Sequence, residues 1–211
     1  MRSVSKRAFD LAMALLSLPV TAPAFAVCAL AIRLTDGKPV LYRGVRAGLN
    51  GRPFVMYKFR TMIADAERCG GTSTAADDRR ITAVGHSLRR WKLDELPQLL
   101  NVIKGDMSLV GPRPQVLEEV AGYTPEEREI LSVKPGITDY ASIRFRDEGE
   151  ILRGQPDPDE AYQRLIRPEK MRLGLLYARE RSLSADVRIL WKTVLAVLGR
   201  RRAEEAQARR R

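Results

Sequence analysis

The sequence contains little histidine, cysteine or aromatic side chain, and each shortage excludes a class of mechanism. With a single histidine, His86, a histidine dyad or a histidine-rich metal site is all but excluded, and we interpret His86 as a surface residue. The two cysteines, Cys28 and Cys69, lack the spacing of a zinc site or a disulfide framework, which indicates a reducing, cytoplasmic compartment. Aromatic residues form only 6% of the chain, which disfavours a single-stranded nucleic-acid surface built from stacking platforms.

Positive charge, by contrast, is abundant. The 211 residues carry a formal net charge of +11, and the isoelectric point is about 10.1. A chain this basic is expected to meet an anionic partner, which can be nucleic acid, anionic lipid headgroups or phosphorylated substrates. The apolar share of 45% supports a packed core, and the 30% of charged residues excludes a polytopic membrane protein or a disordered tail. The length fits one domain plus an appendage.

A long uncharged segment, residues 11–32, follows the short basic N-terminus. It has about the 20 residues that a straight helix needs to cross a hydrocarbon core. A cleaved signal peptide, a spanning helix and a re-entrant helix, which leaves the bilayer on the side it entered, are the three interpretations. The run is long for a signal peptide, and Asp10 interrupts the basic segment expected before it.

Two prolines and the flanking charges favour the re-entrant helix. Pro19 and Pro23 lie in the middle of the run, and an interior proline removes a backbone hydrogen bond and bends a helix. A spanning helix carries its lysine and arginine bias on one side only, whereas this run is basic at both ends: Arg2, Lys6 and Arg7 before it, and Arg33, Lys38, Arg43 and Arg46 after it. We therefore predict a re-entrant membrane anchor at residues 1–33, with a kinked spanning helix as the alternative.

Residues 34–198 have the pattern of one compact cytoplasmic domain of the α+β class, mainly helical with a small β-hairpin. Asn50-Gly51 is a strong hairpin dipeptide, and the expected strands cover residues 39–42 and 53–59. Helices are expected over residues 94–104, 168–181 and 186–198. The last of these contains Trp191 and also suits an amphipathic helix at a membrane interface.

The remaining segments are predicted to lack regular structure. Residues 65–80 are polar and glycine-bearing, which indicates a mobile loop, and the acidic residues 146–160 indicate another loop. Residues 199–211 form a basic tail that we predict to be disordered. Such a tail is either drawn to anionic headgroups or simply solvated.

The residues that carry chemistry are concentrated between residues 81 and 114. Asp94 and Glu95 stand just before an expected helix, where an aspartate alone is usually a helix cap. Arginine and lysine side chains surround this pair, namely Arg89, Arg90, Lys92 and Arg113. Helix N–H groups and guanidinium groups bind phosphate oxygens, and carboxylates hold Mg²⁺ that also contacts substrate phosphates. An aspartate so placed can attack phosphorus and form a covalent intermediate.

A set of ordered motifs makes the sequence recognisable. They are KRAFD at residues 6–10, YKFRTM at 57–62, LDELPQLLNV at 93–102, GDMSLVGPRP at 105–114 and KPGIT at 134–138. The set resembles the bacterial sugar transferase family, the small monotopic phosphoglycosyl transferases, over nearly the whole chain. Each motif alone would be weak, but their order and spacing together are specific.

The resemblance implies roles for individual residues. Asp94 matches the family's nucleophile, and Glu95 matches its partner, which supports the metal or its geometry. Both carboxylates are therefore expected to serve as ligands of a Mg²⁺ cofactor. Pro23 matches the proline that breaks the re-entrant helix. The side chains expected to bind the diphosphate are Lys58, Arg60, Arg89 and Arg113.

The resemblance also implies an activity and its setting. The expected reaction transfers a sugar 1-phosphate from a UDP-sugar to polyprenyl (undecaprenyl) phosphate through a phosphosugar-aspartate intermediate. It releases UMP and starts a glycoconjugate or an exopolysaccharide. The expected location is the cytoplasmic face of the bacterial inner membrane, against anionic lipid headgroups, without nucleic acid and compatible with a homodimer. A membrane-tethered nucleic-acid binder and a noncatalytic scaffold are the alternatives, and the former leaves the Asp94-Glu95 pair unexplained.

The sequence departs from the family pattern at three places. Ala22 stands before Pro23 where relatives often have serine. Asp139-Tyr140 follows the KPGIT motif where many relatives have glycine and tryptophan. The acidic segment at residues 147–160 resembles only a subset of the family. These last two differences prevent the usual sugar from being carried over to this chain.

Overall fold

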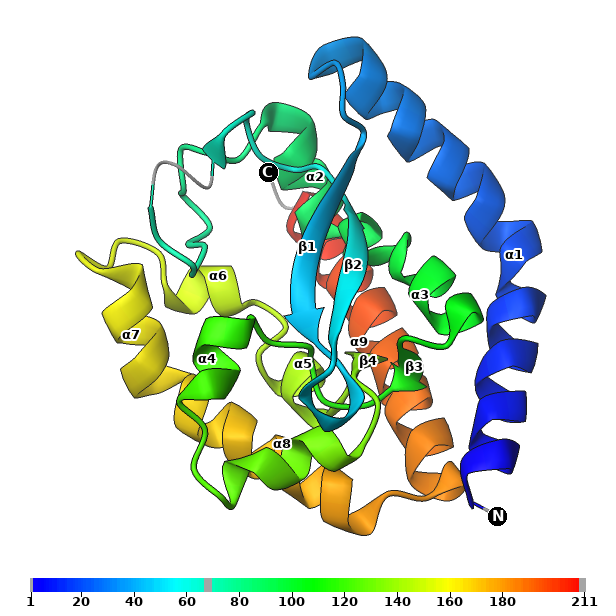
Figure 1. Ribbon diagram of the computed structural model, residues 1–211. Coiled ribbons are helices and arrows are strands. Elements are labelled where there is room, and N and C mark those ends of the chain that lie inside the picture. Colours follow the sequence, from blue (N-terminus) through cyan, green and yellow to red (C-terminus); the bar gives the residue numbers. More distant parts are fainter. Residues whose placement is uncertain (1, 67–69, 209–211) are drawn as a thin grey trace.

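The computed structural model describes residues 2–66 and 70–208 (Figure 1). Cys69 and the last three arginines of the predicted tail, Arg209, Arg210 and Arg211, lie outside the described residues. The fold is mainly helical with small β elements, as the sequence predicts. Helix α1 runs along one side of a domain that all the other elements build.

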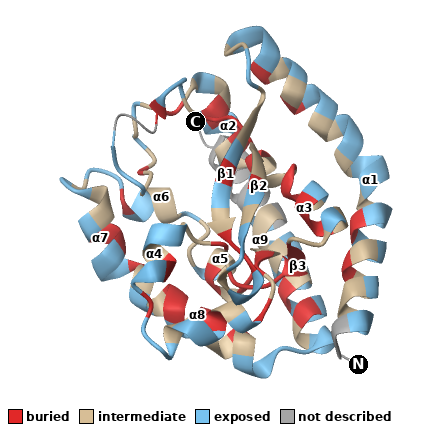
Figure 2. Ribbon diagram, in the orientation of Figure 1, coloured by how far each residue is buried: buried red, intermediate tan, exposed pale blue. Residues whose placement is uncertain are grey.

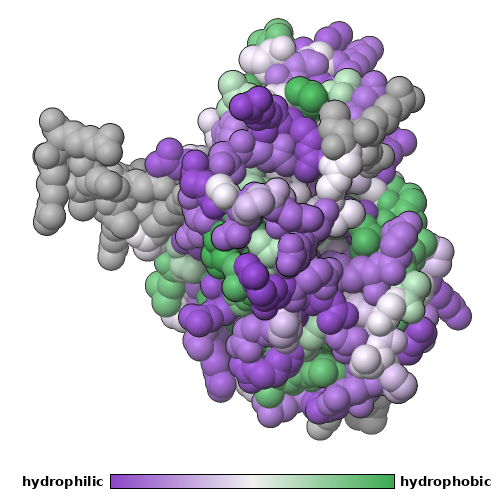
Figure 3. All heavy atoms as spheres, turned by 90° about the vertical axis from the view of Figure 1, so that its left-hand side faces the viewer, coloured by the Kyte–Doolittle hydropathy of each residue, from purple (hydrophilic) through white to green (hydrophobic). Residues whose placement is uncertain are grey.

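Helix α1, Arg2–Thr35, is long and apolar enough to cross a bilayer. Only 11% of its most apolar stretch is buried, so it is not the core helix of a soluble domain. Small residues such as Ala14 and Cys28 face the domain, whereas Leu16 and Val20 are 73% and 78% exposed. Figure 2 shows the same division along the helix. The opposite face of the molecule is largely hydrophilic (Figure 3).

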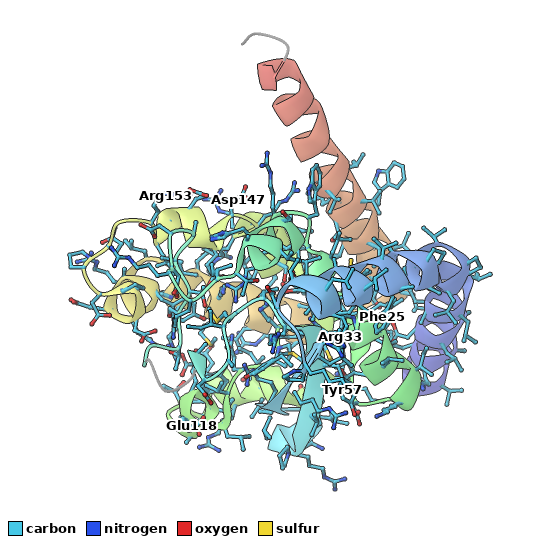
Figure 4. The ribbon with its side chains drawn as sticks, turned by 90° about the horizontal axis from the view of Figure 1, so that it is seen from above. Phe25, Arg33, Tyr57, Glu118, Asp147 and Arg153 are labelled. Atoms are coloured by element: carbon cyan, nitrogen blue, oxygen red, sulfur yellow. The ribbon has the colours of Figure 1, made fainter. Side chains whose placement is uncertain are left out.

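The middle of α1 is bent, as the view from above shows (Figure 4). Pro19 and Pro23 lie inside this helix, and each removes one backbone hydrogen bond. Close to them, the hydroxyl groups of Ser17 and Thr21 donate to the carbonyl groups of Ala14 and Ser17, at 2.7 and 3.0 Å. Polar groups beside the bend therefore find partners within the helix, which a bilayer requires.

The N-terminal half of α1 is tied to the domain by buried polar contacts. Asp10, only 3% exposed, accepts a hydrogen bond of 2.9 Å from the Ser108 hydroxyl. The Lys6 ammonium lies 2.8 Å from Asp10 and 3.0 Å from Asp186 of helix α9, Leu183–Ala208. Arg7 donates to backbone carbonyls at the end of helix α3, Gln98–Lys104, where the helix dipole favours a cation.

The C-terminal half of α1 docks on the same domain through apolar packing. Phe25 packs against Phe59 in a tilted arrangement with 4.7 Å between ring centroids, and Ile32 is fully buried in the same cluster. In Figure 4, Phe25 and Arg33 are seen at this end of the helix, near the strand that carries Tyr57. Both halves of α1 therefore contact one domain.

The predicted hairpin is confirmed. Strand β1, Leu41–Ala47, pairs antiparallel with β2, Pro53–Phe59, through the short 3₁₀ turn η1, Leu49–Gly51. Asn50 and Gly51 adopt φ values of 55° and 75°, the left-handed region that Asn and Gly tolerate best. The first strand extends well beyond the predicted residues 39–42, because its backbone pairs along the full length of β2.

A second, parallel pair of strands lies in the core and was not predicted. Strand β3, Ser108–Val110, pairs with β4, Gly136–Thr138. Both strands are short, and buried runs this brief carry no periodic signal. Around them packs the main hydrophobic core, which includes Val102, Met107, Val110, Tyr177 and Ile189.

The remaining helices surround these strands. They are α2 Ala83–Arg90, α3 Gln98–Lys104, α4 Leu117–Ala121, α5 Tyr140–Arg144, α6 Glu148–Ile151, α7 Pro158–Leu165, α8 Arg167–Glu180 and α9 Leu183–Ala208. Short 3₁₀ turns lie at Leu93–Glu95 (η3) and Glu127–Ser132 (η4). The helix expected from Pro168 is confirmed as α8. Helix α9 continues through Ala208, so the backbone of residues 199–208, assigned above to a disordered tail, is helical, in keeping with its alanine-, glutamate- and glutamine-rich sequence.

The prediction of a loop over residues 146–160 is wrong. The segment contains α6 and the start of α7, where the Asp157 side chain caps the helix by accepting from two backbone N–H groups. Asp159 accepts hydrogen bonds from the backbone of Thr72 and Ser73, at distances of 2.6 to 3.2 Å. The polar stretch predicted as a loop over residues 65–80 is thereby fastened to α7. Proline within the acidic segment begins a helix instead of interrupting one.

Candidate active site

Asp94 and Glu95 lie in the tight turn η3 between α2 and α3. The turn begins after Lys92, whose φ of 56° reverses the chain in the left-handed region. Helix α3 starts only at Gln98, so Asp94 is not its N-cap, and the predicted helix over residues 94–104 begins one turn later. Asp94 is 8% exposed despite its charge, which requires either a partner or a function.

One oxygen of Asp94 has no hydrogen-bond partner among the described residues. This atom, Oδ1, is buried, while Oδ2 lies 4.0 Å from the Lys58 ammonium. Burial raises the pKa of Asp94, the Lys58 charge acts against that rise, and the Glu95 charge adds to it. The Asp94 carboxylate therefore keeps one buried oxygen without a hydrogen-bond partner among the described residues, beside the positive charge of Lys58.

Glu95 is held very differently, by two cations. Its Oε1 accepts from the Arg113 guanidinium at 2.7 Å and from the Lys58 ammonium at 3.2 Å. Burial acts to raise the pKa of Glu95, but the charges of Arg113 and Lys58 outweigh it, so that pKa lies well below its usual value. Glu95 is thus a fixed anion, and its environment separates it chemically from the adjacent Asp94.

The two cations come from distant parts of the chain. Lys58 belongs to β2, and Arg113 lies in the Gly-Pro-Arg-Pro turn directly after β3. The Glu95 charge raises the pKa of Arg113, whereas burial and the Arg113 charge lower that of Lys58. The structure therefore brings two predicted phosphate ligands, Lys58 and Arg113, against the two predicted catalytic carboxylates.

Arg89 lies at the edge of the same group. Its Nε donates to the Thr61 hydroxyl at 2.8 Å, and the Asp94 charge partly offsets the lowering of its pKa by burial. Thr61 was not identified as a site residue from the sequence, although it belongs to the YKFRTM motif. Its hydroxyl orients the Arg89 guanidinium, whose charge acts on Asp94.

The structure does not bring Arg60 and Pro23 to the carboxylates. The Arg60 guanidinium donates to the backbone carbonyls of Asp36, Gly37 and Lys38, directly after α1. It thereby fixes the segment that follows the C-terminal end of α1. Pro23 lies on the exposed outer surface at the bend of α1.

The carboxylate pair fits Mg²⁺ better than a metal that proteins enclose completely. Within the described residues, no group of three or more histidine, cysteine, aspartate or glutamate side chains could hold a metal ion. Mg²⁺ is commonly held by one or two carboxylates and completed by water and substrate phosphates. The unpartnered Oδ1 of Asp94 is a suitable ligand for such an ion, with Glu95 beside it.

Comparisons with known proteins match this chain to one protein family over nearly its whole length. The family described as "Bacterial sugar transferase" matches residues 1–200. An "Uncharacterized sugar transferase EpsL" of Bacillus subtilis is 37% identical, over 92% of this chain and 88% of that protein. The "Exopolysaccharide production protein PSS" of Rhizobium leguminosarum is 38% identical, over 93% of this chain and 96% of that protein. A "UDP-glucose:undecaprenyl-phosphate glucose-1-phosphate transferase" of Escherichia coli is 37% identical, over 90% of this chain and 39% of that protein.

Proposed function

The chain belongs to the bacterial sugar transferase family, and we propose that it transfers a sugar 1-phosphate from a UDP-sugar to undecaprenyl phosphate. The name of the Escherichia coli relative describes this type of reaction. The observation that carries the proposal is the buried Asp94, with one unpartnered oxygen beside a fixed Glu95 and two cations. Release of UMP from a panel of UDP-sugars, with Mg²⁺ and undecaprenyl phosphate, tests it.

The reaction proceeds in two displacements at one phosphorus atom. In the first, an oxygen of Asp94 attacks the phosphorus that bears the sugar, and the bond from this phosphorus to the bridging oxygen breaks to release UMP. In the second, a phosphate oxygen of the lipid attacks the same phosphorus and displaces the Asp94 carboxylate. The product is a polyprenyl diphosphate sugar, and Asp94 returns to its starting state.

The other residues stabilise charge on the transferred group. Lys58, Arg89 and Arg113 place positive charge around Asp94 before any substrate binds, and such preorganised charge is worth most in a site that excludes water. Glu95 keeps Lys58 and Arg113 in place through contacts of 3.2 and 2.7 Å. A Mg²⁺ ion held by Asp94 and Glu95 would neutralise phosphate charge.

We further infer that α1 is re-entrant and that both its ends lie on the cytoplasmic side of the inner membrane. Support comes from its contacts: the Asp10 end and the Ile32 end both pack on one domain. A domain with a hydrophilic surface cannot lie on both sides of a bilayer. Between these ends, α1 bends at Pro19 and Pro23, which lets it enter the bilayer and return to the same side. Its exposed apolar surface then contacts the lipid.

Cysteine labelling tests this topology. In a Cys28→Ala, Cys69→Ala background, Ser5→Cys and Lys38→Cys report the two ends of α1, and Glu118→Cys reports the domain. A membrane-impermeant maleimide is expected to label all three in inverted vesicles and none in intact spheroplasts. Labelling of Ser5→Cys in spheroplasts, with Lys38→Cys protected, would show a spanning helix instead.

The pH dependence of the first displacement tests the assignment of Asp94. Because burial raises its pKa, the fraction of ionised nucleophile should fall as the pH drops through a value above that of an ordinary aspartate. The rate of the UMP burst, measured without lipid acceptor, should therefore decline on the acid side at a pH above the pKa of an ordinary aspartate. In Glu95→Gln the neighbouring negative charge is gone, so this decline should move to lower pH, while the plateau rate falls by about 10- to 100-fold. An unmoved decline in Glu95→Gln would contradict the assignment.

A further inference from the structure

A buried glutamine lies one turn after the two carboxylates and has no role in the reaction as described above. Gln98 is the first residue of α3 and is only 1% exposed. The nitrogen of its side-chain amide, Nε2, is buried and has no hydrogen-bond partner among the described residues. Because a buried donor without a partner costs free energy, such groups in native proteins are nearly always paired. The Gln98 amide therefore has the capacity to donate to a ligand.

The backbone is continuously helical from η3 into α3, and this fixes where Gln98 lies. Leu96 and Pro97, which join the two elements, have φ values of −52° and −62° and ψ values of −39° and −17°. In a helical segment, side chains three and four residues apart share one side, so Gln98 lies on the side of Glu95 and Asp94. Helical side chains also point toward the N-terminus of their helix. The Gln98 amide is therefore directed at the turn that carries the carboxylates.

Strand β2 covers this side of the helical segment before and after Gln98. The Lys58 ammonium lies 4.0 Å from Oδ2 of Asp94. One turn beyond Gln98, the Asn101 side chain accepts a hydrogen bond of 3.0 Å from the backbone N–H of Tyr57. Tyr57 and Lys58 are neighbours in β2, so these contacts enclose Gln98 between Asp94 and Asn101. The same strand thus covers the glutamine and brings Lys58 to the site.

Two atoms of opposite kind are left open on this side of the turn. Oδ1 of Asp94 is a buried acceptor and Nε2 of Gln98 is a buried donor, and neither has a hydrogen-bond partner among the described residues. A metal ion alone would leave the amide N–H groups unpaired, since they can only donate. A phosphoryl group suits both atoms, because its phosphorus takes the carboxylate oxygen while its non-bridging oxygens accept hydrogen bonds.

We propose that Gln98 is a further catalytic residue, whose side-chain N–H donates a hydrogen bond to a non-bridging oxygen of the phosphoryl group as this group moves onto and off Asp94. The inference rests on the proposed function. Lys58 and Arg113 are shared with Glu95, whereas the Gln98 amide has no other hydrogen-bond partner among the described residues. Because burial already fixes this donor, it needs no reorganisation when negative charge grows on the phosphoryl oxygen.

Replacing Gln98 by methionine tests this contact. Methionine fills a similar volume without an N–H donor. In the full-length protein, Gln98→Met should lower kcat for UMP release by about 10²- to 10³-fold, the scale of losing one preorganised donor, and should slow the UMP burst similarly. The inhibition constant of UMP should stay within about threefold. The acid-side decline of the burst should stay at the wild-type pH, because no charge near Asp94 changes.

Thermal unfolding separates a catalytic role from a packing role. Since an unpartnered buried donor opposes folding, Gln98→Met should unfold at the wild-type temperature or above it. Asn101 is the matched control, because it is fully buried on the same side of α3 but donates to the Val55 carbonyl at 2.7 Å and accepts from Tyr57. Asn101→Leu leaves these backbone groups without partners and should unfold at a lower temperature.

The outcomes for Gln98 differ from those for the proposed function. Absence of wild-type turnover with every donor would overturn the proposed function and the role of Gln98 with it. Where the wild type turns over, a kcat of Gln98→Met within about threefold of wild type would exclude the glutamine from the reaction. A lower unfolding temperature of Gln98→Met would assign the amide to packing. An acid-side decline at higher pH would assign its hydrogen bond to the Asp94 carboxylate, and each of these results overturns the proposal.

Discussion

Replacing Asp94 by asparagine is expected to reduce UMP release by about four orders of magnitude or more, the scale of losing a nucleophile. Asparagine keeps the shape of the side chain and removes the charged oxygen that attacks phosphorus. Because burial raises the pKa of Asp94, its ionised form opposes folding, and the variant should unfold at the same temperature as the wild type or a higher one. Loss of activity would then report on chemistry.

Two further measurements make this result specific. Glu118→Gln, which changes an exposed carboxylate on α4, is the control and should retain full activity. Intact-protein mass spectrometry with donor and without lipid acceptor should detect the added mass of one phosphosugar on the wild type and none on Asp94→Asn. Full activity of Asp94→Asn, or a phosphosugar on another residue, would exclude the covalent mechanism through Asp94.

Replacing Arg113 by glutamine is expected to cost about 10²- to 10³-fold in kcat/KM, comparable to removing one preorganised donor from a transition state. The change removes the closest cation of Glu95, at 2.7 Å, and a positive charge that acts on Asp94. Glu95 then pairs with Lys58 without the help of Arg113, so less of the Lys58 charge is left for the substrate phosphate. The loss should be smaller in Arg113→Lys, which restores the charge but not the planar guanidinium.

The control for Arg113 is an arginine with similar ion pairs outside the site. Arg179 on α8 pairs with Glu126 and Glu129, both at 2.9 Å, and is exposed. Since exposed pairs contribute little, Arg179→Gln should change kcat/KM by less than about twofold. A loss in Arg113→Gln no greater than in this control would remove Arg113 from the proposed site.

Much of the architecture was predicted from the sequence because its signals are local. The uncharged run with its two prolines predicts a bent apolar helix, and α1 is one. Asn50-Gly51 predicts the hairpin, since few other dipeptides tolerate two left-handed residues. Pro168 predicts the start of α8 because proline needs no backbone hydrogen at a first turn. Asp94 and Glu95 were candidates because acids and arginines stand close together in the chain.

Tertiary structure alone decided which charges meet. Lys58 and Arg60 are two residues apart, a spacing that places both side chains on one face of a continuous strand. Strand β2, however, ends at Phe59, so Lys58 reaches Glu95 while Arg60 leaves the pleat and binds carbonyl groups after α1. The parallel strands β3 and β4 likewise bring Arg113 and Asp139 to one edge. Signals local to the sequence identified α1, α8, the hairpin turn and the chemical groups of the site, because these depend on neighbours along the chain. The pairing of Glu95 with Arg113 and Lys58 depends on where each strand and helix ends in space.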